Sequence, residues 1–167
     1  ELYQSRVEYI KKLMPECCIG VDVIVGFPGE TDDDFIETYQ FLNELDISYL
    51  HVFSYSERTN TLATEMAASV PVKVRNERSK MLRSLSEKKR RYFYEQNLGK
   101  SYEVLFEEDI ENGLIHGFTP NYIRVAVPYI NGLVNTVQRL KLDQINIFGQ
   151  VNGTFVKTKI EMPSLSA

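Results

Sequence analysis

An α/β region followed by a small all-β barrel is the fold that this 167-residue sequence predicts. Over residues 1–70, two apolar runs of strand length alternate with helical patterns, which is typical of a parallel sheet with right-handed crossovers. A long helix with many basic residues is expected over 71–98. From residue 99 to 167, short β-rich runs recur between Asn-Gly signals, which indicates a small antiparallel barrel.

Local patterns in residues 1–70 predict each helix and strand of the first region. Residues 2–14 repeat apolar side chains at helical spacing. The run CIGVDVIVGF at 18–27 is continuous and β-branched, as in a strand that is buried on both faces. Thr31, followed by three aspartates, predicts an N-cap with acids in the first helical turn. A second strand is expected at 49–55, and a short helix at 62–66.

Proline and glycine residues indicate where the elements after residue 70 begin and end. Pro71 fits the first turn of the long helix and Gly99 its C-terminal stop. The expected apolar positions of that helix are Val74, Met81 or Leu82, Leu85 and Tyr92. The Asn-Gly pairs at 112–113, 131–132 and 152–153 predict hairpins or turns between the β-rich runs. The last run, GTFVKTKIEM, is expected to be a strand.

Composition and charge narrow the class of protein. Hydrophobic residues make up 43% of the chain, which permits a packed core, yet no run approaches the roughly 20 apolar residues that span a membrane. Cys17 and Cys18 are the only cysteines and suit a reducing cytoplasm. The net charge is −4, but residues 73–91 hold nine Lys or Arg against two acids. This basic segment is the first candidate for phosphate binding, the alternative being a solvated helix face.

Polar groups follow both predicted strands, at the edge where ligands of parallel sheets collect. In the turns GFPGET and SYSERTNT, and within the first strand, the candidates are Asp22, Glu30, Ser54, Ser56, Glu57 and Arg58. Arg58 could hold a carboxylate or be a solvated loop charge. We expect His51 to be a core histidine. The turns contain no nucleophile set, metal-spaced cluster or phosphate loop, so a purely structural role stays open.

The ordered motifs are more specific than their parts. DVIVGFPGETDDDF, LHVFSYSERTNTLATEM, VPVKVRNERSKMLRSLSEKK, VLFEE and GFTPNYIRV together resemble the C-terminal part of radical S-adenosylmethionine methylthiotransferases. The resemblance covers about residues 1–130 and is strongest to the branch that acts on N6-threonylcarbamoyladenosine in tRNA. Asn60 stands where that branch usually has Gly, so a differently shaped loop is expected.

This resemblance implies the end of a partial TIM-type barrel followed by an OB-like TRAM domain. Such enzymes bind S-adenosylmethionine and two [4Fe-4S] clusters, and they dock the anticodon stem-loop of tRNA. Clusters need several thiolates, which this sequence lacks, so no catalytic residue or metal ligand is expected in it. We therefore expect a cytoplasmic fragment that begins without a Met, is inactive alone and works with N-terminal domains of the same protein.

The resemblance also implies site residues. Those that match strands bordering the cofactor pocket are Asp22, Ile24, Gly26, Phe53, Ser54, Tyr55, Ser56 and Arg58. The candidates for RNA contact, in the basic helix and the TRAM-like segment, are Lys88, Lys89, Arg90, Arg91, Phe118, Tyr122 and Arg124. The aromatic residues of the second set could instead belong to the barrel core. The rival functions are a stand-alone RNA-binding adaptor and a methylthiotransferase with another target, such as isopentenyladenosine in tRNA or a ribosomal protein.

Overall fold

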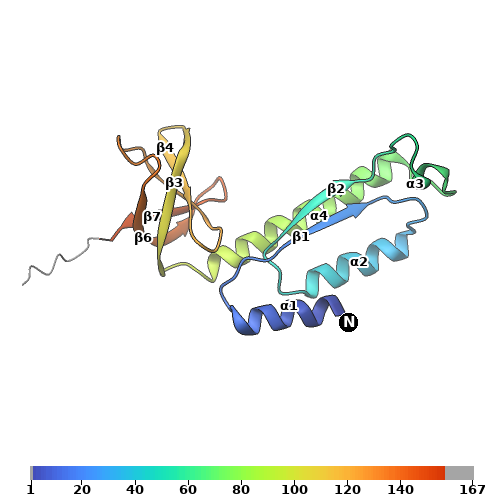
Figure 1. Cartoon of the computed structure of the whole chain (residues 1–167), viewed down its shortest axis with the longest axis horizontal. Coiled ribbons are helices and arrows are strands. Elements are labelled where there is room, and N and C mark those ends of the chain that lie inside the picture. Colours follow the sequence, from blue (N-terminus) through green and yellow to red (C-terminus); the bar gives the residue numbers. More distant parts are fainter. Residues whose placement is uncertain (1, 157–167) are drawn as a thin grey trace, which may run out of the picture. The chain divides into compact units, whose positions relative to one another are not determined.

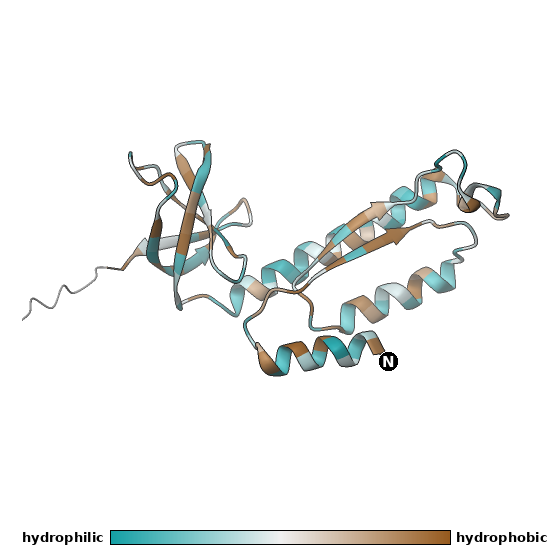
Figure 2. Cartoon of the chain, in the orientation of Figure 1, coloured by the Kyte–Doolittle hydropathy of each residue, from teal (hydrophilic) through white to brown (hydrophobic). Residues whose placement is uncertain are grey.

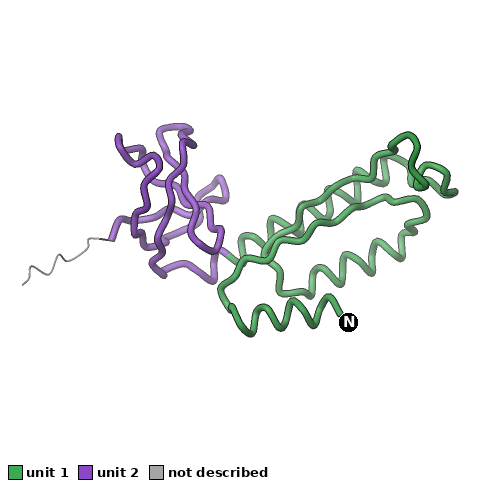
Figure 3. Tube along the Cα trace, viewed as in Figure 1, with its two compact units in different colours: residues 1–93 green, residues 94–167 purple. Residues whose placement is uncertain are grey.

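The computed structural model describes residues 2–156 (Figure 1). The chain divides into two units, Glu1–Phe93 and Tyr94–Ala167 (Figure 3). The division lies within helix α4, which runs over Val72–Glu95 and ends four residues before Gly99. Among the described residues, no helix is both long and apolar enough to cross a membrane.

The first unit is built of two parallel strands and their helices. Its elements before α4 are α1 (Leu2–Leu13), β1 (Gly20–Val25), α2 (Asp32–Glu44), β2 (Tyr49–Ser54) and α3 (Leu62–Glu65). The predicted order of elements and the parallel pairing are confirmed, with the register running from Gly20 opposite Tyr49 to Val25 opposite Ser54. Within residues 2–156 this sheet has two strands, so the larger TIM-type barrel is not part of the described structure.

One face of this sheet carries the core of the unit. Val21, Val25 and Leu50 are buried there and share a cluster with residues of α1, α2 and α4, namely Val7, Phe35, Leu42, Leu82 and Leu85. The opposite face is open, and β1 alternates between buried and exposed residues along its length. The prediction of a strand buried on both faces is therefore wrong for the described chain. Both faces of β1 and β2 carry apolar residues (Figure 2), and the helices cover one face, whereas the open face combines Ile24 and Phe53 with Asp22 and His51.

The predicted cap of α2 is confirmed. Thr31 Oγ1 accepts a hydrogen bond from the backbone N–H of Asp34 at 3.1 Å, and the Asp34 carboxylate accepts one from the Thr31 N–H at 2.9 Å. Hydrogen bonds from the side chain and backbone of Thr31 hold the pKa of Asp34 below its ordinary value. Because this capping box fixes the first turn of α2, it also fixes where the loop after β1 ends.

The second unit is a closed five-stranded barrel. Its strands are β3 (Ser101–Glu111), β4 (Leu114–Phe118), β5 (Arg124–Pro128), β6 (Val137–Ile145) and β7 (Val151–Phe155). They follow the order β3-β4-β5-β7-β6, and β6 pairs back to β3. The β5–β7 pair is parallel, so the expectation of a wholly antiparallel barrel is wrong. Strand direction can alternate around a closed ring only when the number of strands is even, and here it is five.

The barrel interior is filled by apolar side chains. Fully buried members are Val104, Phe106, Ile115, Val125, Leu140, Leu142 and Val151. Asn112 and Gly113 have φ of 52° and 78° and make the predicted turn. The predicted turn at 152–153 is wrong, because both residues lie within β7. A Cβ on Gly153 would lie 2.8 Å from Leu140 Cδ2, so glycine here serves close packing.

Two other sequence predictions concern α4 and the end of the barrel. Tyr92 is 62% exposed, whereas Phe93 and Tyr94 are buried, so the expected apolar face of α4 is wrong at its C-terminal end. Leu82, rather than the alternative Met81, belongs to the core. The predicted final strand GTFVKTKIEM begins inside β7, and its residues 157–162 lie outside the described residues.

Candidate functional site

The open face of the two-stranded sheet gathers several of the predicted cofactor residues. The strand register places Asp22 of β1 beside His51 of β2, and Ile24 beside Phe53. Ile24 is 59% exposed and Phe53 is 53% exposed. Two bulky apolar side chains, Ile24 and Phe53, thus lie next to each other near the carboxyl ends of parallel strands. The polar pair, Asp22 and His51, precedes them by two residues in each strand.

His51 is not a core histidine, so that prediction is wrong. Its side chain is exposed on the open face, and its ring meets that of Tyr49 edge-on, with centroids 4.8 Å apart. The side chains of a strand alternate between faces, and His51 falls on the same face as Tyr49 and Phe53 rather than on the face covered by helices.

The loops that follow β1 and β2 are tied to each other. The Tyr55 N–H donates a hydrogen bond to the Val25 carbonyl at 2.8 Å, and the rings of Phe27 and Tyr55 lie 5.4 Å apart. Gly26 has a φ of 78°, and its N–H donates to the Glu30 carboxylate at 2.8 Å. The positive φ explains the glycine, and the bond fixes the path of the chain as it leaves the sheet.

Arg75 of α4 holds the second of these loops. It is 4% exposed, and its guanidinium donates to the backbone carbonyls of Val70 at 2.7 Å and Tyr55 at 3.0 Å. The same group donates to the Glu57 carboxylate at 2.5 Å and to Ser69 Oγ at 2.9 Å. The hydrogen bond from Arg75 holds the pKa of Glu57 below its ordinary value. One buried cation therefore fixes the backbone of the loop after β2.

The loop after β1 is held by the same helix. A Cβ on Gly26 would lie 2.3 Å from Arg75 Cγ, so the arginine stem packs directly against this glycine. One turn further along α4, Arg78 forms ion pairs with Glu30 and Asp32, the latter at 2.6 Å, and lies over the ring of Phe35. Both cations stay charged, because the donated hydrogen bonds raise the pKa of Arg75 and the carboxylates raise that of Arg78 against desolvation.

Arg75 and Arg78 were counted in the sequence as part of a basic, phosphate-binding segment, and their structural role was missed. The signal was present in their spacing. Together with Leu82 and Leu85 they fall on one helical face, which is the face that packs against the sheet. Cations at core positions of an amphipathic helix indicate buried ion pairs more than a solvated surface.

The remaining members of the predicted cofactor set lie in the loop after β2. Ser54, Ser56 and Arg58 are exposed. Within the described residues, Arg58 forms no ion pair with a carboxylate, and the neighbouring Glu57 pairs with Arg75. Asn60 has a φ of 64°, so it keeps the left-handed backbone that a glycine would supply at this position.

The described residues fit an organic cofactor better than an iron–sulfur cluster. The Tyr55 hydroxyl is buried and has no hydrogen-bond partner in the described chain, which leaves a polar atom for a ligand to satisfy. No group of three or more His, Cys, Asp or Glu within residues 2–156 is arranged to hold a metal ion. Cys17 and Cys18 are half-buried free thiols, and burial raises the pKa of Cys18.

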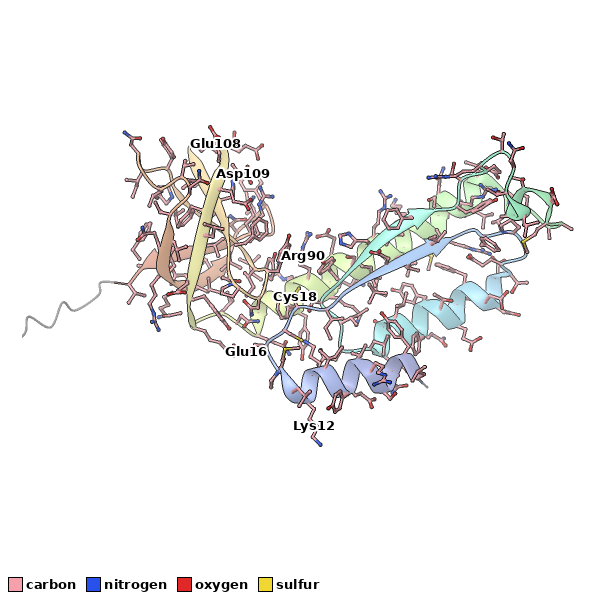
Figure 4. All side chains as sticks on the ribbon, in the orientation of Figure 1. Lys12, Glu16, Cys18, Arg90, Glu108 and Asp109 are labelled. Carbon is pink, nitrogen blue, oxygen red and sulfur yellow. The ribbon has the colours of Figure 1, made fainter. Side chains whose placement is uncertain are left out.

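The basic residues proposed for RNA contact fall into different environments. Lys88 and Arg91 are exposed, and Arg90, labelled in Figure 4, forms an ion pair with Glu87. Lys89 instead donates to the backbone carbonyls of Asn43 at 3.0 Å and Leu45 at 2.7 Å, and burial lowers its pKa. Lys89 therefore stabilises the C-terminal end of α2, where a cation also meets the helix dipole favourably.

The barrel residues of the predicted RNA set also differ from one another. Tyr122 is 63% exposed, and its ring lies 5.0 Å from that of the half-buried Phe118. Arg124 donates to the Asp109 carboxylate at 2.6 Å. An exposed tyrosine braced by a second ring suits stacking on a base, whereas Arg124 is already paired with an acid.

The comparisons with known proteins give a consistent result. The chain is 44% identical over 125 residues to the threonylcarbamoyladenosine tRNA methylthiotransferase MtaB of Aquifex aeolicus, which covers 75% of the chain and 29% of that protein. It is 36% identical over 146 residues to MtaB of Bacillus subtilis, covering 85% of the chain and 32% of that protein. No family model matches the sequence.

A related enzyme with another named product aligns over more of the chain. The tRNA-2-methylthio-N(6)-dimethylallyladenosine synthase of Thermus thermophilus is 33% identical over 168 residues, covering 96% of the chain and 36% of that protein. The chain thus spans about a third of the length of these curated relatives. The aligned region includes both units of the chain. The relatives that share it are named as tRNA methylthiotransferases or as a 2-methylthio-adenosine synthase. The chain belongs to the methylthiotransferase family.

Proposed function

We propose that this chain is part of a radical S-adenosylmethionine methylthiotransferase that acts on N6-threonylcarbamoyladenosine next to the anticodon of tRNA. The chain would supply one wall of the cofactor pocket and a domain that docks the tRNA. The choice of nucleoside is supported by the 44% and 36% identity to two proteins named for it. The observation that carries the proposal is the exposed pair of Ile24 and Phe53 at the carboxyl ends of two parallel strands.

The open sheet face suits an adenosine-containing ligand. Ile24 and Phe53 offer an apolar surface for the flat adenine ring, and Asp22 is placed to accept hydrogen bonds from ribose hydroxyls or an ammonium group. The loop after β2 also holds the buried Tyr55 hydroxyl, which has no hydrogen-bond partner among the described residues. Gly26 lets the chain turn away sharply where β1 ends. When bound, S-adenosylmethionine supplies the 5′-deoxyadenosyl radical that begins methylthiolation in this class of enzymes.

The role of Arg75 and Arg78 in this proposal is to hold the pocket edge in one shape. Both are buried, and between them they bind the loops after β1 and β2 through backbone carbonyls and carboxylates. A site that is fixed before its ligand arrives loses less conformational entropy on binding. The iron–sulfur clusters would be held by other parts of the enzyme, so we expect this chain alone to be inactive.

The tRNA would be docked by exposed cations in the C-terminal half of α4 and by the barrel. Lys88 and Arg91 are the cations proposed to meet phosphates, and Tyr122, supported by Phe118, is proposed to meet a base. Lys89, Arg90 and Arg124 leave the proposed set because they bind α2 carbonyls, Glu87 and Asp109, respectively. A tRNA substrate would place the enzyme in the cytoplasm.

The experiment is the affinity of this chain for a tRNA anticodon stem-loop across a salt series. We expect binding to weaken as salt rises, and Lys88→Ala and Arg91→Ala each to reduce the slope of log affinity against log salt by about 0.7 to 0.9 for each phosphate that the variant no longer neutralises. Lys73→Ala, whose side chain is 88% exposed near the other end of α4, is the matched control. Absent binding, or binding that does not depend on salt, would contradict the docking role.

A further inference from the structure

The loop between β6 and β7 exposes two large apolar side chains that the sequence did not single out. Ile147 is 93% exposed and Phe148 is 64% exposed, next to each other in residues 146–150. Loops run over the protein surface and often carry binding residues, and adjoining exposed apolar side chains are a feature of interaction sites.

The loop is braced by a single side chain. Asn146 Oδ1 accepts hydrogen bonds from the backbone N–H groups of Phe148 at 2.9 Å and Gln150 at 3.1 Å. Its amide group donates to Asn152 Oδ1 at 3.2 Å, and Gly149 takes a φ of 74° to complete the turn. Phe148 is therefore presented by an ordered turn, and a partner that binds it has little loop motion to arrest.

The loop lies at the same end of the barrel as Tyr122. Strands β5 and β7 are parallel neighbours, and Val125 is opposite Val151. Tyr122 and Phe148 each stand three residues ahead of these paired valines. Two exposed aromatic rings, 63% and 64% exposed, thus belong to neighbouring loops at one end of the barrel.

The charges of the barrel disfavour an anionic partner less at this end than at the hairpin end. The loop 96–100 also lies there, since the Gly99 N–H donates to the Leu142 carbonyl at 2.7 Å near the end of β6. Together the loops 96–100, 119–123 and 146–150 contain one lysine and no Asp or Glu. Four of the five acids of β3 lie toward the opposite end and its β4 hairpin, where Figure 4 labels Glu108 and Asp109; they are Glu107, Glu108, Asp109 and Glu111. The fifth, Glu103, lies opposite Arg139 of β6. A polyanion is therefore repelled more strongly from the hairpin end than from the aromatic end.

We infer that Tyr122 and Phe148 form a stacking site for unpaired ribonucleotides, with Ile147 as an apolar flank. The inference rests on the proposed docking of tRNA and names the chemistry of the contact. Every base offers a flat face, so the site recognises bases that are free of a double helix rather than a sequence. Phosphate contacts are left to cations elsewhere, because the three loops carry a single lysine.

The test compares two RNAs that share one stem: a hairpin with a seven-nucleotide unpaired loop, and a blunt-ended duplex of the same stem without a loop. We expect Phe148→Ala and Tyr122→Ala each to weaken binding of the looped RNA by about 5- to 150-fold, the range for removal of one base stack, without changing the salt slope. Binding of the duplex should stay as in the unaltered chain. Phe148→Trp keeps a stacking ring and should retain affinity.

Tyr129→Ala is the matched control, because Tyr129 is also exposed, at 42%, and its N–H donates to Gly113 in the hairpin at the opposite end. Phe148→Ala that binds looped RNA like the unaltered chain, or that weakens looped and duplex RNA equally, would overturn the stacking site while leaving salt-dependent docking in place. If the unaltered chain binds neither RNA, both the stacking site and the proposed docking function are wrong. Binding of a protein partner at the same loop with no RNA effect would also overturn the inference.

Discussion

The two units differ in how far the strands of each sheet are paired and how far its faces are covered. In the barrel, every strand has a neighbour on both sides and the inward side chains fill one core. In the first unit, β1 and β2 pair only with each other within the described residues, and helices cover one of their two faces. Ile24 and Phe53 on the open face are more than half exposed, whereas Phe106 inside the barrel is fully buried.

This difference indicates which surface each unit offers for binding. The barrel has no free edge, so the surface that it offers to a partner consists of loops and exposed rings such as those of Tyr122 and Phe148. The first unit offers a whole sheet face, and Arg75 and Arg78 fix the shape of the loops at its end. A closed sheet is stable by itself, and an open apolar face gains free energy when a ligand or another part of a protein covers it.

The largest expected effect contrasts one phenylalanine of each unit. Phe106→Ala should lower the free energy of unfolding of the barrel by about 3 to 5 kcal/mol, because it removes a fully buried ring and leaves a cavity. Phe53→Ala should change the stability of the first unit by no more than about 0.5 kcal/mol, since its ring is exposed. Urea unfolding followed by hydrogen exchange in each unit measures both. A large loss from Phe53→Ala would mean that the face is covered.

A smaller effect is expected from Arg75→Ala. The change leaves the carbonyl oxygens of Val70 and Tyr55 without their donor, which should cost about 1 to 3 kcal/mol. Hydrogen exchange should accelerate in the loop 54–58 and not in the barrel, and Lys73→Ala, two residues earlier on the exposed side of α4, should change neither. Unaltered exchange in this loop would show that Arg75 does not hold it.

The smallest effect is a dependence of stability on pH. Arg75 holds the pKa of Glu57 below its ordinary value, so the unfolded chain binds this proton more readily than the folded one. The contribution of the pair is therefore present above the ordinary pKa and is lost as the pH falls through the lowered one. Thermal unfolding across acid pH should show a shallower acid loss for Glu57→Gln than for the unaltered chain. The same loss in both, with Glu44→Gln as control, would contradict the assignment.

Local patterns predicted most elements, because their signals lie within a few residues. Thr31 and the aspartates after it specify the start of α2, and Asn112 with Gly113 specifies the β3–β4 turn. The Asn152-Gly153 pair carried the same local signal but lies in a strand. There the long-range pairing of β7 with β5 and β6 overrides the preference for a turn.

The candidate site was predicted in part for a related reason. The family resemblance selected Asp22, Ile24 and Phe53, which the strand register places on one face, but it did not reveal that this face is open, which decides the exposure of His51. The count of charges in residues 73–91 placed Arg75, Arg78 and Lys89 in the same phosphate-binding candidate segment as Lys88. Only the packing of α4 against the sheet and α2 separates the cations that hold the fold from those left at the surface.

The most direct test of the proposed function is a chimera with the Aquifex aeolicus relative. The 125 aligned residues of that enzyme would be replaced by the matching residues of this chain, and its tRNA would be analysed by mass spectrometry for the 2-methylthio derivative of threonylcarbamoyladenosine. We expect the chimera to form this product, and Phe53→Asp within it to abolish S-adenosylmethionine binding. A folded chimera with loaded clusters that leaves threonylcarbamoyladenosine unmodified would contradict the proposed function.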